Sequence, residues 1–267
     1  MIRLKNRGEI EAIARSGAII AEVLEALRDE VIPGVTTAKL DAFAEDLIRS
    51  HRGASPAFKG LYGFPATLCT SRNEEVVHGI PSSKVQLREG DILKVDVGVR
   101  LNGWYADAAI TYPVGNIDIQ AQRLLEVTRE ALLLGIEAAV PGNHVGDVGV
   151  AIQRVAESAG FSVVRDLVGH GLGREPHEEP QVPNFGKPGQ GPRLVEGMVL
   201  AIEPMVNLGR AEVSTRDDGW TVVTWDGSLS AHFEHTVAVT NGEAQILTLP
   251  SGRRSEALEA WRAISSG

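Results

Sequence analysis

The feature of this sequence that most restricts its fold is a pattern that occurs twice. The segment "EGDILKVD" begins at residue 89 and "EGMVLAIE" begins at residue 196, which is an offset of 107 residues. The turn segments "IPG" at residue 32 and "VPG" at residue 140 are separated by a similar 108 residues. Because the offsets agree, we expect two related halves, roughly over residues 8–116 and 118–250; chance recurrence of common elements is the alternative.

Local patterns predict the same order of elements in both halves. Residues 8–30 show apolar positions at helical spacing, and "PGVTTAKLDAFAEDLIRSHRG" predicts a turn, a threonine cap and a second helix. The segment "GDILKVDVGVRLNGWYADAAITYPVG" predicts two strands joined by a turn at Asn102-Gly103. Residues 118–140 and "PGNHVGDVGVAIQRVAESAG" predict the helices of the second half. Each half is therefore helix-helix-strand-hairpin, and we expect one α+β domain over residues 1–267.

Composition argues against several classes of protein. A net charge of −9 disfavours a nucleic-acid binder with a broad basic surface. Charges interrupt the N-terminal segment too often for the core of a signal peptide, and no run of about 18 apolar residues is present to span a membrane. The single cysteine, Cys69, excludes an internal disulfide and is typical of a reducing compartment. We therefore expect a cytoplasmic protein that binds neither nucleic acid nor membrane.

The segment "GHGLGREPHEEP", residues 169–180, combines two histidines with acidic residues, glycines and prolines. Glycine and proline favour loops, and loops held on a rigid scaffold often carry functional residues. His170 and His177 are candidate metal ligands or proton shuttles. Taken alone the segment also fits a solvated turn, so its role depends on which other residues converge on it.

Acidic residues interrupt apolar strands at matching places in the two halves. Asp96 lies in "ILKVDVGV" and Glu203 in "MVLAIEPMV". Isolated carboxylates in such surroundings are costly unless they are paired, hydrogen-bonded or bound to a cation. Asp107 and Glu234 repeat the anomaly, each eight residues before a glycine. A solvated, outward-facing position explains one such acid more readily than four, so the pattern indicates a shared site.

Four carboxylates around one axis need a counter-charge, since two unit charges ~4 Å apart repel by about 4 kcal/mol at intermediate dielectric. Lys94 is close in these strands, but its two-residue spacing from Asp96 is weak support for that role. Two divalent metal ions bridged by carboxylates neutralise the charge more readily and form a known hydrolytic arrangement. His170 would add a nitrogen ligand.

The candidate ligands and the segments around them resemble those of a known family. The set Asp96, Asp107, His170, Glu203 and Glu234 is similar to the five-ligand dinuclear site of the type I methionine aminopeptidases. The resemblance extends over essentially the whole chain and is carried by "NEEVVHGIP", "GHGLGREPHEEPQV", "IEPMV" and "DGWTVVTWDGSLSAHFEHTVAVT". It implies the pita-bread fold, in which two pseudo-symmetric halves form a curved antiparallel sheet covered by helices. It also implies removal of the initiator methionine from nascent proteins when the next residue is small.

The resemblance implies a role for each candidate ligand. Asp107 and Glu234 would bridge two metal ions, and Asp96 would complete one ligand shell. His170 and Glu203 would complete the other shell, and Glu203 would also act as general base. Mostly oxygen ligands with one imidazole admit Mn(II), Fe(II), Co(II) or Zn(II).

The resemblance also implies which residues meet the substrate. His78 would contact the peptide at the scissile bond, and His177 would donate to the carbonyl oxygen as negative charge develops there. Pro176 stands where many type I enzymes carry an aromatic residue, which leaves the shape of the methionine pocket open. The side chains expected to line that pocket are Phe64, Cys69 and Trp220. The remaining histidines are given structural roles: His232 and His235 in support of the strand, and His51 and His144 at helix ends or in loops.

Two other interpretations stay open. A proline-specific aminopeptidase or dipeptidase shares the fold and the ligands, although such enzymes usually carry an N-terminal domain for which 267 residues leave no room. A non-enzymatic binding scaffold shares the fold, but such relatives have lost metal ligands, whereas all five are present here. As partners we expect the N-termini of nascent polypeptides at the ribosome, and we expect a monomer.

Overall fold

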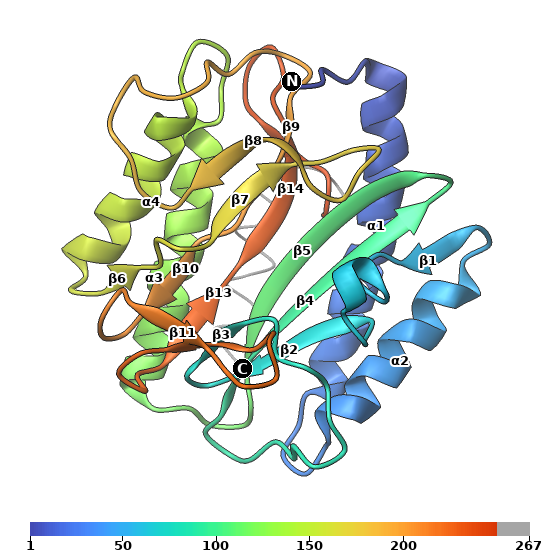
Figure 1. The fold of residues 1–267 in the computed structure, drawn as a ribbon, viewed down its shortest axis with the longest axis vertical. Coiled ribbons are helices and arrows are strands. Elements are labelled where there is room, and N and C mark those ends of the chain that lie inside the picture. The colour runs from blue at the N-terminus through green and yellow to red at the C-terminus, as the bar shows by residue number, and fades with distance from the viewer. Residues whose placement is uncertain (250–267) are drawn as a thin grey trace.

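A computed structural model describes residues 1–249 of the chain (Figure 1). The single domain expected from the sequence ends at residue 267, and the second of its two halves ends at residue 250. Both ends lie outside the described residues, so the single domain stays a prediction. A short 3-10 turn, Leu61–Gly63, lies between the first two strands. The α-helices of the described chain are α1 (Arg7–Glu30), α2 (Thr37–Ser50), α3 (Ile119–Ala138) and α4 (Val145–Ser158).

The strands form one large sheet with the path β1-β4-β5-β14-β9-β7-β8, and β2 and β15 pair with β4 and β14. Every strand pairing in it is antiparallel. Its strands are β1 (Ala54–Pro56), β2 (Leu68–Arg72), β4 (Ile92–Leu101), β5 (Trp104–Pro113), β7 (Val168–Gly171), β8 (Glu178–Pro183), β9 (Val199–Ile202), β14 (Glu234–Ala238) and β15 (Gln245–Ile246).

Two small antiparallel sheets border the large one, in the orders β13-β10-β6 and β11-β12-β3. Their strands are β3 (Glu75–Val77), β6 (Ser162–Val163), β10 (Met205–Asn207), β11 (Val213–Thr215), β12 (Val222–Thr224) and β13 (Ser230–His232). In the large sheet, the order β4-β5-β14-β9 places the strands of the two halves symmetrically about the β5–β14 pair. The acidic residues of both halves therefore lie on neighbouring strands.

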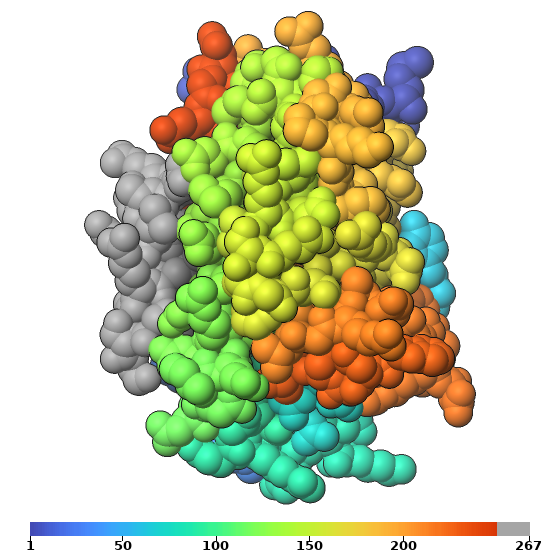
Figure 2. Space-filling view, turned by 90° about the vertical axis from the view of Figure 1, so that its left-hand side faces the viewer, coloured from blue at the N-terminus to red at the C-terminus, as the bar shows by residue number. Residues whose placement is uncertain are grey.

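The helices cover one face of the large sheet. In Figure 1, α1 lies behind β4 and β5, α2 lies beside β1 at the edge of the sheet, and α3 and α4 lie behind the strands of the second half. Figure 2 shows α3 and α4 on the outer surface of that half. Val95 and Val97 of β4 belong to the core beneath α1 and α2. Because successive strand residues point to opposite faces, Asp96 projects from the face without helices.

Local sequence explains where the helices begin. Asn6 accepts a hydrogen bond from the amide of Glu9, whose side chain accepts one from the amide of Asn6, which is a capping box at α1. Thr36 is the N-cap of α2, as expected, but its side chain makes no capping hydrogen bond. None of the described helices combines the length and apolar character that a membrane span requires.

The expectation that residues 169–180 form a loop was partly wrong, because both ends of the segment are strands. Gly169 and Gly171 lie in β7, and a Cβ at either position would come within 2.3 Å of a backbone oxygen, of Ala201 or of Glu179. These glycines permit close backbone approach between strands, which composition alone does not distinguish from a loop. The segment between Gly171 and Glu178 connects the two strands.

Candidate active site

Strand register brings three of the candidate acids onto one face of the sheet. Asp96 of β4 and Glu234 of β14 both lie opposite Ala109 of β5. Residues directly opposite in an antiparallel pair project to the same side, so both carboxylates lie on the side of Ala109. Asp107 precedes Ala109 by two positions and projects there too. All three point away from the helices.

The other two candidates reach the same place from β7 and β9. His235 pairs with Ile202, so Glu203, the next residue after β9, comes level with Glu234. His170 lies in β7, which pairs with β9 through Gly171 and Leu200. Its Nε2 atom lies 3.6 Å from Oδ2 of Asp107 and 3.6 Å from Oε1 of Glu203.

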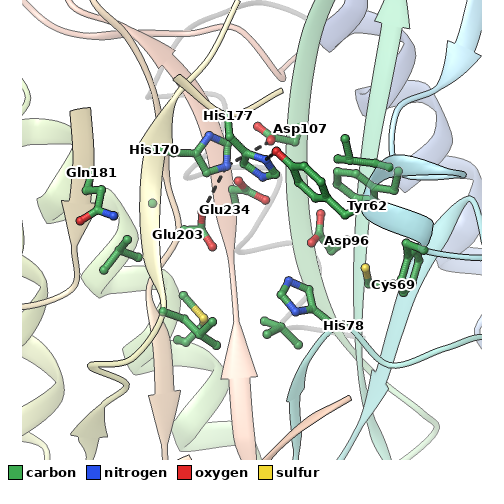
Figure 3. A pocket seen from close by; sticks show the side chains of 18 of the residues that line it. Tyr62, Cys69, His78, Asp96, Asp107, His170, His177, Gln181, Glu203 and Glu234 are labelled. Carbon is green, nitrogen blue, oxygen red and sulfur yellow. Dashed lines mark hydrogen bonds and ion pairs between the residues drawn. The ribbon is translucent and has the colours of Figure 1, made fainter. Parts of the chain in front are cut away.

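These side chains line a cavity of about 590 Å³. Figure 3 shows the carboxylates and His170 pointing toward one another, with His177 and Tyr62 beside them and His78 lower in the view. The structure brings all ten residues selected from the sequence to this cavity. They are Phe64, Cys69, His78, Asp96, Asp107, His170, His177, Glu203, Trp220 and Glu234.

The four carboxyl groups share a low-dielectric site. Burial, followed by the charges of neighbouring acids, raises the pKa values of Glu203 and Glu234 well above those of ordinary glutamates. Burial and the charge of Asp107 do the same for the pKa of Asp96. Burial also raises the pKa of Asp107, although His170 and Thr236 oppose the shift. Full ionisation therefore requires a counter-charge.

The donor set fits divalent metal ions. Single ligand atoms of Asp107, His170 and Glu234 lie within 4.8 Å of one another. Oδ1 of Asp96 is buried and has no hydrogen-bond partner among the described residues, as expected of an oxygen meant for a cation. Nδ1 of His170 donates to the carbonyl of Gly171 at 3.0 Å, which leaves the lone pair of Nε2 facing the acids. Carboxylate oxygens and one imidazole are ligands suited to the metals expected from the sequence.

Lys94 does not supply the counter-charge. It is 1% exposed, and its Nζ donates to the carbonyl oxygens of Asn73 at 2.7 Å and of Ser230 at 2.9 Å. The ammonium group thus ties the turn after β2 to β13. Burial lowers its pKa to about 7.

One end of the cavity is apolar. The rings of Phe64 and Trp220 meet edge to face at 5.1 Å, and Cys69, opposite Asp96 in the β2–β4 pair, lies beside them. His78 stands edge-on to Trp220 at 6.5 Å and has a positive φ of 60°. Burial lowers the pKa of His78. An apolar slot next to a cluster of carboxylates suits a substrate with an apolar side chain and a positive charge.

Comparison with known proteins agrees with this geometry. The sequence matches metallopeptidase family M24 over residues 11–241. A methionine aminopeptidase of Clostridium perfringens is 55% identical over 249 residues, which are 93% of this chain and 99% of the relative. The chain belongs to the methionine aminopeptidases.

Structures of methionine aminopeptidases share the whole architecture. The crystal structure of the Thermotoga maritima enzyme has a TM-score of 0.92 and 48% identity, and the match covers 93% of this chain and 100% of that one. A prolidase from Pyrococcus furiosus shares the fold at a TM-score of 0.74 and 24% identity, with 92% of this chain and 65% of the prolidase covered. The expected resemblance to type I methionine aminopeptidases and the pita-bread fold are confirmed.

The histidines that were given structural roles lie as expected, and one of them, His232, also lies close to Glu203. His51 ends α2 and His144 is the N-cap of α4. His235 lies in β14 and contacts Thr248 Oγ1 through Nδ1 at 2.8 Å. His232 of β13 is 1% exposed, and its Nε2 lies 3.8 Å from Oε2 of Glu203. Burial lowers the pKa of His232 to about 3, so the ring beside Glu203 is neutral.

Sequence reasoning missed residues that hold the site together. The hydroxyl of Thr236 donates to Oδ1 of Asp107 at 3.0 Å and accepts from its amide at 3.1 Å. A threonine two residues after Glu234 falls on the same strand face, which is the signal that could have found it. Tyr62 and Gln181 also line the cavity. For Tyr62 the signal is an aromatic residue one position before a glycine in "LYGFP".

Proposed function

We propose that this protein removes the N-terminal methionine from newly made polypeptides when the residue after the methionine is small. Metal-dependent removal of N-terminal methionine is the activity for which its family is named. The observation that carries the proposal is the convergence of four carboxyl groups and His170 beside an apolar slot in one cavity. A peptide that places its first side chain in the slot puts its amino group and first peptide bond near the acids.

In this proposal the five clustered side chains would hold two divalent ions. Asp107 and Glu234 would serve as ligands to both ions, Asp96 would add a ligand to one of them, and His170 and Glu203 would add ligands to the other. Bound divalent ions supply Lewis acidity and make a water nucleophilic near neutral pH. Mn(II), Fe(II), Co(II) and Zn(II) all suit these ligands, and cellular availability selects among them.

Glu203 and the two histidines outside the ligand set move protons and position the substrate. Glu203 is the general base, and burial, which raises its pKa well above the ordinary value of a glutamate, supports this role. His177 donates to the carbonyl oxygen of the scissile bond. Burial, aided by the nearby His170 and His78, lowers the pKa of His177 to about 4, so it acts as a neutral donor. His78 contacts the peptide at the scissile bond.

Phe64, Cys69 and Trp220 line the methionine pocket. A long thioether fills a narrow apolar slot, and its sulfur makes favourable contacts with aromatic edges. Norleucine, which matches methionine in length, is accepted to some degree, and N-terminal lysine or aspartate is refused. Pro176 is buried, and it is not one of the described residues that line the cavity. A substitution of Pro176 therefore changes the apolar slot only indirectly.

Tripeptide hydrolysis tests the proposal. Met-Ala-Ser, Met-Gly-Ser and Met-Leu-Ser are compared with Ala-Pro-Ala, each with and without a chelator. We expect fast, chelator-sensitive cleavage of Met-Ala-Ser and Met-Gly-Ser, and slow cleavage of Met-Leu-Ser, because a bulky second side chain displaces the scissile carbonyl and ~1 Å of displacement costs about 100-fold. Preference for Ala-Pro-Ala would move the protein to the proline-specific relatives. No cleavage under any metal would favour a binding scaffold.

The cellular setting is part of the proposal. The enzyme acts in the cytoplasm as a monomer on nascent chains at the ribosome and does not bind nucleic acid directly. Light scattering checks the mass in solution. Co-sedimentation with translating ribosomes, compared with naked ribosomal RNA, checks how the protein reaches its substrates.

A further inference from the structure

Tyr62 is an exposed aromatic residue that a rigid loop holds at the mouth of the cavity. The residue is 75% exposed, and its φ of +51° is a left-handed conformation that tyrosine rarely adopts. Gly60 and Gly63, on either side, also have positive φ values of 89° and 91°. The backbone turn therefore places this exposed ring at the mouth of the cavity, next to His177 (Figure 3).

Several contacts fix the loop that carries Tyr62. The amide of Ala57 donates to the carbonyl of Gly98 in β4 at 2.9 Å, and the amides of Thr67 and Leu68 donate to Oδ1 of Asp41 at 2.9 and 2.8 Å. Within the turn, the amide of Phe64 donates to the carbonyl of Leu61 at 2.9 Å. One end of the loop is thus anchored to the sheet and the other end to α2.

The ring and hydroxyl of Tyr62 both meet His177. The two rings stack with centroids 5.9 Å apart and planes 14° apart. The Tyr62 hydroxyl lies 3.5 Å from Nδ1 of His177, a long contact of the kind that shortens in many enzymes once substrate binds. His177 also contacts His170, whose ring stands edge-on to it with the ring centroids 4.5 Å apart. Tyr62 therefore occupies the outer side of this imidazole.

We propose that Tyr62 is a positioning residue for His177: its hydroxyl donates to Nδ1 and its ring covers the imidazole, which leaves the proton of the neutral ring on Nε2. A neutral imidazole has one N–H donor and one acceptor nitrogen, and the partner of one nitrogen decides which form is present. A phenol is a good donor to an imidazole lone pair, so Nδ1 is the acceptor. The inference rests on the proposed role of His177, because Nε2–H is then the donor offered to the carbonyl oxygen.

Nitrogen NMR tests the contact without relying on turnover. The full chain, labelled with ¹⁵N-histidine, is compared metal-free and loaded with diamagnetic Zn(II), and the signals of His177 are assigned by their loss in His177→Ala. We expect a protonated Nε2 and an unprotonated Nδ1 in the wild type, and a mixture of both forms in Tyr62→Phe, which keeps the ring but loses the hydroxyl. An Nδ1–H form in the wild type, or the same form in both proteins, would overturn the proposal.

Kinetics on Met-Ala-Ser test the consequence. We expect Tyr62→Phe to lower kcat about three- to tenfold, the effect of one hydrogen bond, with KM changed by less than about twofold. Tyr105→Phe is the matched control, since Tyr105 of β5 does not line the cavity, and its kcat is expected to be unchanged. In a His177→Ala background, Tyr62→Phe is expected to have no further effect. An equal loss in both backgrounds would show that Tyr62 does not act through His177.

The two proposals fail in different ways. If His177→Ala keeps wild-type turnover, the donor role of His177 is wrong, while the NMR comparison still decides the contact with Tyr62. If His177→Ala loses turnover and Tyr62→Phe changes neither the NMR signals nor kcat, only the role of Tyr62 is wrong.

Discussion

Nε2 of His170 lies 3.6 Å from Oδ2 of Asp107 across the sheet, although the two residues come from different halves of the chain. The hydrogen bond from Nδ1 of His170 to the carbonyl of Gly171 keeps the Nε2 lone pair on that side, and Thr236 fixes the carboxylate. Both groups are thus held in place without a metal ion. Such preorganisation reduces the free energy needed to arrange ligands when an ion binds.

The first prediction concerns metal content. Chelation is expected to abolish activity reversibly. Asp107→Ala and Glu234→Ala are each expected to lose bound metal and to lower activity by more than about 100-fold, because even substitution of residues that hydrogen-bond to metal ligands lowers metal affinity or activity by about 10- to 100-fold. Elemental analysis is expected to give two ions per chain in the wild type. Glu130→Ala, an exposed position on α3, is the control that should keep both metal and activity. Full turnover in metal-free protein would refute the site.

The second prediction concerns Glu203. Glu203→Gln keeps the shape of the side chain but removes its charge and basicity, so kcat on Met-Ala-Ser is expected to fall by about 10²- to 10⁴-fold. Part of the metal binding should survive, because the other four candidate ligands are intact. Wild-type turnover in this variant would exclude Glu203 as the base.

The third prediction separates His177 from the ligands. His177→Ala is expected to lower kcat by about 10²- to 10³-fold, as the loss of an oxyanion donor does, with an unchanged metal content. His144→Ala, at the N-cap of α4, is the control and should leave kcat unaltered. Loss of metal from His177→Ala would instead place this histidine among the ligands.

The fourth prediction concerns the pH dependence of stability in metal-free protein. Burial raises the folded-state pKa of Glu234 well above 4.5, so above pH 4.5 the folded state keeps a proton that the unfolded state has lost. The free energy of unfolding must then fall as pH rises, by up to about 1.4 kcal/mol per pH unit for this group. Glu234→Gln lacks this ionisation, whereas every other titratable group is common to both proteins.

Thermal unfolding of the two metal-free proteins between pH 5 and pH 8 measures the effect. We expect the Tm of the wild type to fall relative to that of Glu234→Gln across this range. Saturating Zn(II) should remove the difference by stabilising the ionised wild type. Parallel Tm curves without metal would contradict the proton uptake inferred for the buried acid.

The fifth prediction links packing to substrate binding. A Cβ at Gly98 would lie 2.6 Å from Cε1 of Phe58, on the strand face that carries Asp107. Gly98→Ala is therefore expected to destabilise the fold by about 1–3 kcal/mol and to displace the loop with Tyr62. A displacement of ~1 Å would lower kcat/KM by about 100-fold. Gly8→Ala, in the open first turn of α1, should leave kcat/KM unchanged and serves as control.

Several elements and most site residues could be predicted because their signals are local. An acid inside a run of β-branched residues is visible in the sequence. The alternation of side chains along a strand then places Asp96 on the face opposite to that of Val95 and Val97. The turn at Asn102-Gly103 is equally local, since both residues have positive φ values, 52° and 84°. The repeat, at an offset of 107 residues, relates Asp96 to Glu203 within the sequence itself.

The tertiary structure alone decided which segments became neighbours. Only the pairing of β5 with β14 brings Glu234 beside Asp96, and only β7, a strand where a loop was expected, carries His170 to Asp107. The contact between Tyr62 and His177 joins residues 115 positions apart and leaves no local signal of its own. Local sequence determines which face of a strand a side chain takes, whereas strand order depends on how both halves bury their apolar faces together, and that is a property of the whole chain.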